Sequence, residues 1–178
     1  MGSPKCVQRV TVVAWVPWEI PLMEPIDLLK TCKGKIVSLN EETRRLVASL
    51  QPTRRCMSVL AELRARNVKF RLETYTYCPL SAGVRLSCIK EKIGKMRVEK
   101  RRSGLRVIMV FAGRIVVVEF SRKGVSIRVG RRALALPSVI VPSDLEVSLE
   151  DLGEVEEISL RISRLIEECA STSEREEQ

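Results

Sequence analysis

Residues 105–129 read LRVIMVFAGRIVVVEFSRKGVSIRV, and this stretch predicts antiparallel strands joined by tight turns. Apolar and β-branched residues dominate it, a composition typical of half-buried strands. The glycine-containing turns Ala112-Gly113 and Arg122-Lys123-Gly124 divide it into three segments. Short connections with glycine are typical of β-hairpins, so we expect a β-meander here. The three expected strands are 105–111, 114–120 and 125–129.

Two further segments alternate with a period of two, as strands do. In residues 68–77 the side chains of Val68, Phe70 and Leu72 are expected on one face. The opposite face then carries Lys69, Arg71, Tyr75 and Tyr77. Residues 6–16 are rich in β-branched side chains and predict another strand.

A helix is expected across residues 40–51. Asn40 is a good N-terminal cap, and Glu41 and Glu42 place negative charge at the positive end of the helix dipole. Pro52 would end the helix, because proline lacks the backbone N–H that a helix needs. Its expected apolar face consists of Leu46, Val47 and Leu50.

Three more helices are expected before the meander. A short one starts near Pro25 and ends near Gly34, and another is capped by Thr53 and stopped by Asn67, which tolerates left-handed backbone. A third begins near Ser81. Its apolar residues recur at helical spacing and are Leu86, Ile89, Ile93 and Met96.

The C-terminal part predicts an amphipathic helix. Ser143-Asp144-Leu145-Glu146 has the sequence of a capping box, in which the serine and glutamate side chains bond free N–H groups of the first turn. Apolar residues then recur at heptad spacing, which favours a coiled coil and self-association. The alternative is a single helix packed on its own domain. The candidate oligomerisation residues are Val155, Ile158, Ile162 and Leu165.

These elements predict an α+β fold. N-terminal helices are expected to pack on an antiparallel β-meander, followed by a C-terminal coiled-coil helix. We expect a basic α+β nucleic-acid-binding domain over residues 1–142, an acidic oligomerisation helix over 143–170, and a flexible tail over 171–178.

The formal net charge of +9 combines two parts of opposite sign. Residues 1–143 contain 28 Lys and Arg against 10 Asp and Glu, whereas residues 144–178 contain 3 against 12. The body therefore carries +18 and the tail −9. Residues 90–132 alone hold 14 cations and three acids, so local pairing cannot neutralise this segment.

Such a cluster suits phosphate backbones, which release counterions when cations bind them. The face of 68–77 adds aromatic rings that can stack on unpaired bases, and Trp15 and Trp18 could join it if residues 6–16 lie alongside. The alternatives are a solvated surface, pairing with the acidic tail, another polyanion, and tyrosines that cover a helix. The candidate nucleic-acid-binding residues are Lys69, Arg71, Tyr75, Tyr77, Arg97, Lys100, Arg101, Arg102, Arg106 and Arg114.

The residue types give little support to catalysis. Histidine is absent, which excludes Ser-His-Asp triads and most zinc hydrolases. There is no phosphate-binding glycine loop, dinucleotide-binding glycine pattern or paired-acid motif. We therefore expect a non-enzymatic protein with no catalytic residue, metal site, cofactor or small-molecule substrate.

The six cysteines are all at least ten residues apart, so they form no metal-binding or redox motif. They are expected to be small buried apolar residues, or to form one or two disulfides if the source is a hyperthermophile. Arginine outnumbers lysine and amide residues are scarce, which fits such a source. The apolar run of residues 10–18 is too short to span a membrane, so we expect no membrane partner and a cytoplasmic location.

The order of the expected elements resembles that of the ThermoDBP and ThermoDBP-related single-stranded DNA-binding proteins of hyperthermophilic archaea. The matching order is helices across 25–66, a strand at 68–77, a meander at 105–129 and a heptad helix at 155–169. The resemblance implies an N-terminal domain of helices and antiparallel sheet, distinct from an OB-fold, with an oligomerising C-terminal helix. It transfers no binding residue to this chain.

We therefore expect a non-catalytic protein that binds single-stranded DNA, or RNA, as a dimer or tetramer. The alternative is an assembly protein whose acidic tail docks a partner and whose basic face meets an acidic protein or ribonucleoprotein. A duplex-binding regulator ranks lower, because no recognition helix is evident.

Overall fold

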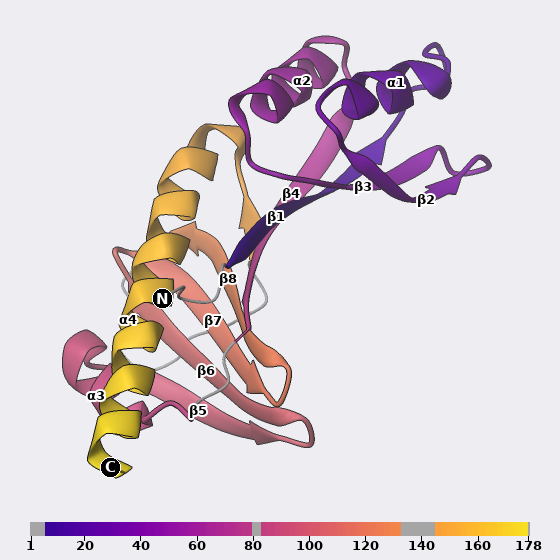
Figure 1. Cartoon of the computed structure of the whole chain (residues 1–178). Coiled ribbons are helices and arrows are strands. Elements are labelled where there is room, and N and C mark those ends of the chain that lie inside the picture. Colours follow the sequence, from indigo (N-terminus) through magenta and orange to yellow (C-terminus); the bar gives the residue numbers. More distant parts are fainter. Residues whose placement is uncertain (1–5, 80–82, 133–144, 178) are drawn as a thin grey trace.

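The computed structural model describes residues 6–79, 83–132 and 145–177. Its framework is an antiparallel sheet of nine strands (Figure 1). The strands are β1 (Val7–Trp15), β2 (Lys35–Asn40), β3 (Arg45–Leu50), β4 (Lys69–Cys78), β5 (Met96–Arg101), β6 (Gly104–Phe111), β7 (Arg114–Ser121), β8 (Gly124–Arg132) and β9 (Glu146–Val147). The helices are α1 (Met23–Thr31), α2 (Arg54–Ala65), α3 (Leu86–Ile93) and α4 (Leu152–Glu177), with a 3-10 turn at Leu149–Asp151.

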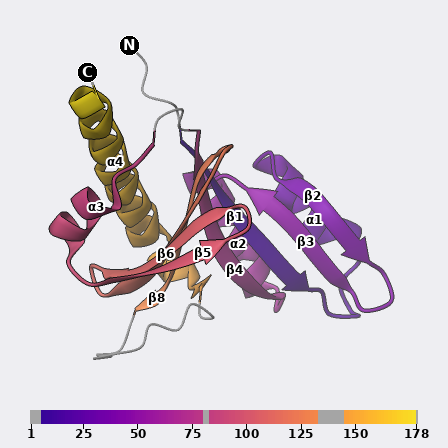
Figure 2. The same ribbon diagram turned by 90° about the horizontal axis from the view of Figure 1, so that it is seen from below.

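The strand order is β2-β3-β1-β4-β8-β7-β6-β5, and β9 pairs with β4 beside β8. Strands β1 and β4 are paired over nine residue positions and link the two halves of the sheet. Helices α1 and α2 lie at one end, and α3 and α4 lie at the other (Figure 1). Seen from below, β2 and β3 lie in front of α1 and α2 (Figure 2).

All four helices contribute to one apolar core on one face of the sheet. Residues of β1 and β3 that face α1 and α2 belong to the same cluster as residues of β7 and β8 that face α4. Burial of this apolar surface is the main stabilising contribution to such a layered fold. The opposite face, which we call the open face, carries a smaller cluster of Ile108, Ile115, Val117 and Leu145.

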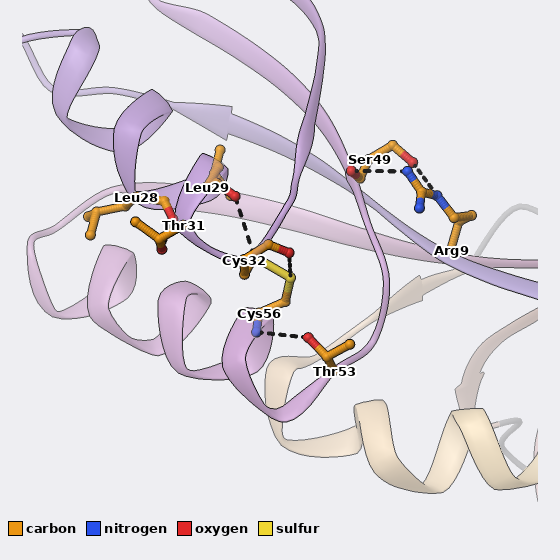
Figure 3. Close-up of a disulfide and its surroundings, with 8 residues drawn as sticks. All are labelled: Arg9, Leu28, Leu29, Thr31, Cys32, Ser49, Thr53 and Cys56. Carbon is orange, nitrogen blue, oxygen red and sulfur yellow. Dashed lines mark hydrogen bonds between the residues drawn. A yellow bond between two sulfur atoms is a disulfide. The ribbon is translucent and has the colours of Figure 1, made fainter.

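Three disulfides join elements that are distant in sequence. Cys6–Cys78 links the start of β1 to the end of β4, and Cys88–Cys169 links α3 to α4. Cys32–Cys56 joins the C-terminal end of α1 to α2 (Figure 3). All six cysteines are therefore paired, one disulfide more than the composition suggested.

The fold is dominated by its sheet to a greater extent than the sequence predicted. The meander, the strand at 68–77 and the C-terminal helix are present, and the helices near 25–33, 53–67 and 86–93 also form. Thr53 accepts a hydrogen bond from the Cys56 N–H, and Asn67 has a φ of 66°. The α+β expectation therefore holds only in coarse outline.

The expected helix at 40–51 is wrong, because this segment forms the β2–β3 hairpin. The Asn40 side chain does accept backbone N–H bonds, but from Glu42 and Thr43 in a turn that Arg44 completes with a φ of 60°. Asn caps turns as readily as helices. The buried residues that follow are Leu46, Ala48 and Leu50, which have the period of a strand.

Two further boundaries differ. Met96 starts strand β5 and does not end a helix, because Gly94 interrupts the helical segment with a φ of 93°. Glu146 lies in strand β9, so the expected capping box does not start a helix there. Its Ser143 and Asp144 lie outside the described residues. Helix α4 starts at Leu152 and continues to Glu177, past the expected end at residue 170.

The heptad residues of α4 belong to the core of their own chain. Val155, Ile158 and Ile162 are buried in the main cluster, and Leu165 packs against it. The three buried side chains therefore make their contacts within their own chain. The predicted oligomerisation residues thus contribute to the core of one chain, where α4 is an amphipathic helix packed on its own sheet, and self-association stays a prediction.

Candidate nucleic-acid interface

The alternation of β4 separates a core face from the open face. Leu72, Thr74 and Thr76 are buried under the helices. The odd-numbered residues of the strand face the other way, and they are Lys69, Arg71, Glu73, Tyr75 and Tyr77. The two-sided pattern predicted from the sequence is thus present, and the tyrosines do not cover a helix.

The strand register aligns Tyr77 with residues from four other strands. Tyr77 lies opposite Ser126 of β8, and the row continues through Glu119, Arg106 and Glu99. Residues that lie opposite one another in a sheet share a face. The open face therefore brings together the tyrosines of β4 and the cations of the β5–β6 hairpin, two groups that are separate in the sequence.

A groove with a volume of about 650 Å³ lies at this end of the open face. It extends from the two tyrosines to the tips of the β5–β6 and β7–β8 hairpins. Its polar and aromatic lining includes Tyr75, Tyr77, Arg101, Arg102, Arg106, Glu119, Arg122 and Lys123. Five cations and one carboxylate in this lining give the groove a positive potential, which attracts anions.

Two glycines shape the hairpin tips that border this groove. Gly104 starts β6 with a φ of 149°, and a Cβ there would overlap the carbonyl oxygen of Phe120. Gly124 has the same φ, and a Cβ there would press on the Cys78 carbonyl and the Tyr77 hydroxyl. Only glycine allows the strands to approach so closely, so the sequence at both tips sets the width of the groove.

The two tyrosines differ in their freedom. The Tyr77 hydroxyl donates a hydrogen bond to the carbonyl oxygen of Lys123, which holds the ring beside the β7–β8 tip. Tyr75 is 39% exposed. Its neighbour across the β1–β4 pair is Arg9, whose Nε donates to the Ser49 hydroxyl at 3.0 Å (Figure 3). An anchored ring and an exposed ring beside cations can both stack on bases.

Carboxylates engage some of the cations but not those at the hairpin tips. Arg106 pairs with Glu119 at 3.0 Å, and Glu99 lies 3.3 Å from Arg101 and 3.4 Å from Arg97. Within the described part of the chain, the exposed side chains of Arg102, Arg122 and Lys123 form no ion pair. Their charge is available to a ligand without breaking an internal contact.

The remaining predicted residues lie elsewhere. Arg97 is on the open face of β5, whereas the alternation places Lys100 on the other side of that strand. Lys69 and Arg71 share the open face with Tyr77 but lie six to eight residues from it along β4. At about 3.3 Å per residue this is a separation of roughly 20–26 Å.

Arg114 is not on the open face. It is buried, and its Nη2 lies 3.0 Å from Glu154 and 3.2 Å from Asp151, at the N-terminal end of α4. Burial alone would lower the pKa of this guanidinium, but the hydrogen bond to Glu154 and the two carboxylate charges together raise it above its usual value. The predicted phosphate contact by Arg114 is therefore replaced by a structural ion pair.

Three groove or border residues were missing from the predicted site. Arg122 and Lys123 were expected only as turn residues of a basic cluster, and Arg9 was expected on a strand of unknown partner. Arg122 and Lys123 could have been predicted as site residues from the sequence, because they are basic residues at the tip of a predicted hairpin. Arg9 could not have been predicted from the sequence, because only the pairing of β1 with β4 places it beside Tyr75.

Acidic residues of the C-terminal part engage the body on the helical side. Glu150 pairs with Arg64, and Glu168 lies 2.6 Å from Lys92 of α3. The pKa of Glu150 lies below its usual value, mainly because Arg64 donates a hydrogen bond to it. Since the sheet lies between these acids and the groove, α4 does not cover the groove.

No group of three or more metal-ligating side chains occurs among the described residues. Within the same residues, no helix is long and apolar enough to cross a membrane. Comparison with protein families found no matching family model, and comparison with curated proteins found no match.

Comparison with solved structures found a similarity to Methanococcus jannaschii TBP. The alignment has a TM-score of 0.39 and 13% sequence identity, and covers 93% of this chain and 99% of that one. Nothing about the fold or the function of this chain follows from a similarity so low.

Proposed function

We propose that the protein is a non-catalytic single-stranded nucleic-acid-binding protein that uses the groove on its open face. The observation that carries the proposal is that Tyr75 and Tyr77 line one groove with the cations of two hairpin tips, three of which form no ion pair in the described part of the chain. Cations hold the phosphates of a strand, and aromatic rings stack on its bases. This combination suits an unpaired strand better than a duplex, whose bases are already stacked.

The side chains have distinct roles in this proposal. Arg102, Arg122 and Lys123 contact phosphates, because they are exposed and form no ion pair with any residue that the structure describes. Tyr77 offers a ring held in place by its hydrogen bond to Lys123, which lowers the entropy cost of binding. Tyr75 provides a second ring two residues along the same strand. Binding of this kind tolerates any base sequence, because every base has a face to stack on.

Fluorescence anisotropy with labelled dT20 at several salt concentrations tests the proposal. We expect the logarithm of the affinity to fall linearly with the logarithm of the salt concentration, by about 0.7 for each phosphate contacted. An unlabelled duplex of the same length should compete weakly, and rU20 reports any preference for RNA. Absence of salt-dependent dT20 binding, or tighter binding of the duplex, would refute the proposal.

A pair of charge-matched variants locates the site. The triple variant Arg102→Ala, Arg122→Ala, Lys123→Ala removes three cations from the groove. The control Lys30→Ala, Arg54→Ala, Arg55→Ala removes three exposed cations from α1 and α2, on the opposite face of the sheet. We expect the groove variant to lower the salt slope by about 2 and the control to leave it nearly unchanged. Equal losses would mean that net charge, and not the groove, causes binding.

A homo-oligomer remains part of the proposal, although the buried side of α4 packs on its own sheet. The second candidate function is an assembly protein that docks a partner through its acidic tail. Ion pairs engage several of these acids with the body, which favours the first candidate. Hyperthermophilic origin and kinship with the ThermoDBP proteins likewise remain predictions.

A further inference from the structure

Trp15 is an exposed aromatic residue on a strand whose other side chains are mostly buried or half-buried. It ends β1 on the open face and is 43% exposed. Val12, Val13 and Ala14, which precede it, are all buried. A large exposed ring on a sheet face, away from the hydrophobic core, is a candidate contact for a ligand.

Cations flank Trp15 on both sides. In the register of the sheet, Lys69 of β4 lies directly opposite Trp15 on one side, and Arg45 of β3 lies opposite it on the other. Both side chains are exposed and, in the part of the chain that the structure describes, form no ion pair. A ring between two free cations has the composition of a stacking platform for an unpaired strand.

Arg71 adds a third cation in the next row. It lies opposite Val13, two residues from Lys69 on the same face of β4. Its Nε is buried and, among the described residues, has no hydrogen-bond partner.

The open face connects this position to the groove. Lys69 and Tyr77 are eight residues apart on β4, about 26 Å at 3.3 Å per residue. Glu73 lies between them, opposite Glu146 of β9. Arg128 is 3.7 Å from the Glu73 carboxylate and Arg131 is 3.6 Å from that of Glu146, and these cations offset the two negative charges. At a duplex-like spacing of 3.4 Å per phosphate, about eight nucleotides span this distance, and an extended strand needs fewer.

We propose that Trp15, with Arg45, Lys69 and Arg71, is a second stacking site for the strand that occupies the groove. This inference rests on the proposed function and adds the course of the strand, along β4 from Tyr77 to Trp15. The occupant is a single-stranded polynucleotide: the ring stacks on a base and the three cations hold adjacent phosphates. A strand that reaches both sites binds more tightly than one that reaches a single site.

Tryptophan fluorescence tests the contact directly. The chain has two tryptophans, so Trp18→Phe leaves Trp15 as the only one, and Trp15→Phe leaves Trp18. Stacking of a base quenches indole fluorescence. We expect dT20 to quench the Trp18→Phe protein and to leave the emission of the Trp15→Phe protein nearly unchanged. Quenching confined to Trp18 would overturn the inference.

Affinity provides a second measurement with a matched control. Trp15→Ala should weaken dT20 binding about 5- to 150-fold, the range for the loss of one stacked base. Trp18→Ala is the control, because Trp18 lies beyond the end of β1 with Arg44 stacked over its ring. It should leave the affinity unchanged, and Trp15→Phe should retain much of it. Circular dichroism establishes that each variant is folded.

The length of the oligonucleotide distinguishes the second stacking site from the proposed function of the groove. The oligonucleotide dT4 is too short to reach both sites, so the gain in affinity from dT4 to dT20 should be smaller for Trp15→Ala than for the natural protein. If dT20 binds through the groove cations but Trp15→Ala changes neither affinity nor length dependence, the second site is refuted and the groove remains. If the natural protein does not bind dT20 at all, the proposed function itself fails.

Discussion

Arg114 illustrates that the alternation of a strand, and not the nearness of a turn, decides which face of the sheet a side chain joins. It follows the Ala112-Gly113 turn at the start of β7, where the sequence alone suggests a phosphate-binding cation next to a hairpin. Counting by two along β7, Arg114 lies on the same face as Val116 and Val118, which belong to the main core, and it lies opposite Phe111 of β6. The side chain instead enters the space under α4 and meets Asp151 and Glu154.

We predict that Arg114→Met lowers the free energy of unfolding by about 1–3 kcal/mol without changing dT20 affinity. The arginine is buried, but its two carboxylate partners are about half exposed and can be solvated when it is removed, so the cost falls below that of breaking a fully buried pair. Chemical denaturation and anisotropy measure the two quantities. A lower dT20 affinity with an unchanged free energy of unfolding would mean that Arg114 contacts the nucleic acid.

Glycine 104 gives a second residue-level prediction. Gly104→Ala should destabilise the protein by about 2–4 kcal/mol and weaken dT20 binding, because the new Cβ would force β6 away from Phe120 and displace the β5–β6 tip. Gly83→Ala is the control, since a Cβ at Gly83 meets nothing within 4 Å. Thermal unfolding and anisotropy compare them. Equal behaviour of the two variants would show that the tip tolerates a side chain.

At the scale of elements, predictions succeeded where local pattern and tertiary contacts agree. The meander and the strand at 68–77 have both strand composition and a period of two. The segment 40–51 has helix signals at its start, yet it pairs with β1, and the buried Leu46, Ala48 and Leu50 follow the strand period. A capping residue is a local signal, and neighbouring strands can override it.

The disulfide between α3 and α4 supports an element-level prediction. Cys88 and Cys169 are separated by 81 residues, so their bond restricts a long loop of the unfolded chain. Replacing both by alanine should lower the free energy of unfolding by about 2–5 kcal/mol. The matched variant Cys32→Ala, Cys56→Ala opens a loop of only 24 residues, and the chain-entropy relation predicts a loss smaller by about 1 kcal/mol.

Denaturant unfolding of both variants, with mass spectrometry of alkylated and unalkylated protein to count the bonds, tests this ranking. A natural protein that alkylates at all six cysteines without reductant would contradict the disulfides themselves. A larger loss for the Cys32–Cys56 variant would show that local packing outweighs the entropy of the loop.

At the scale of the whole molecule, the acids of α4 lie on the opposite side of the sheet from the groove. Acids of α4 and of the turn before it pair with Arg64, Lys92 and Arg114 on the helical side. The hairpin tips present to the groove cations that form no ion pair within residues 6–79, 83–132 and 145–177. Charge and alternation predict which residues of the site are polar or aromatic. They do not predict that Tyr77 lies in one row with Arg106, because that depends on strand pairing between distant segments.

Sequence patterns also do not predict which surface the apolar side of α4 packs against, and the last prediction concerns this contact. A heptad pattern describes any amphipathic helix and does not distinguish a seam between copies from a contact with the helix's own sheet. Ile162 is fully buried, whereas Leu160 is 41% exposed. Ile162→Asp should therefore abolish cooperative unfolding, because it places a charge in the core. Leu160→Asp should leave the fold intact. Circular dichroism measures the folding of the two variants, and light scattering measures their oligomeric state. If the natural protein is an oligomer and Ile162→Asp is a folded monomer, Ile162 contributes to an interface between copies and not to the core of one chain.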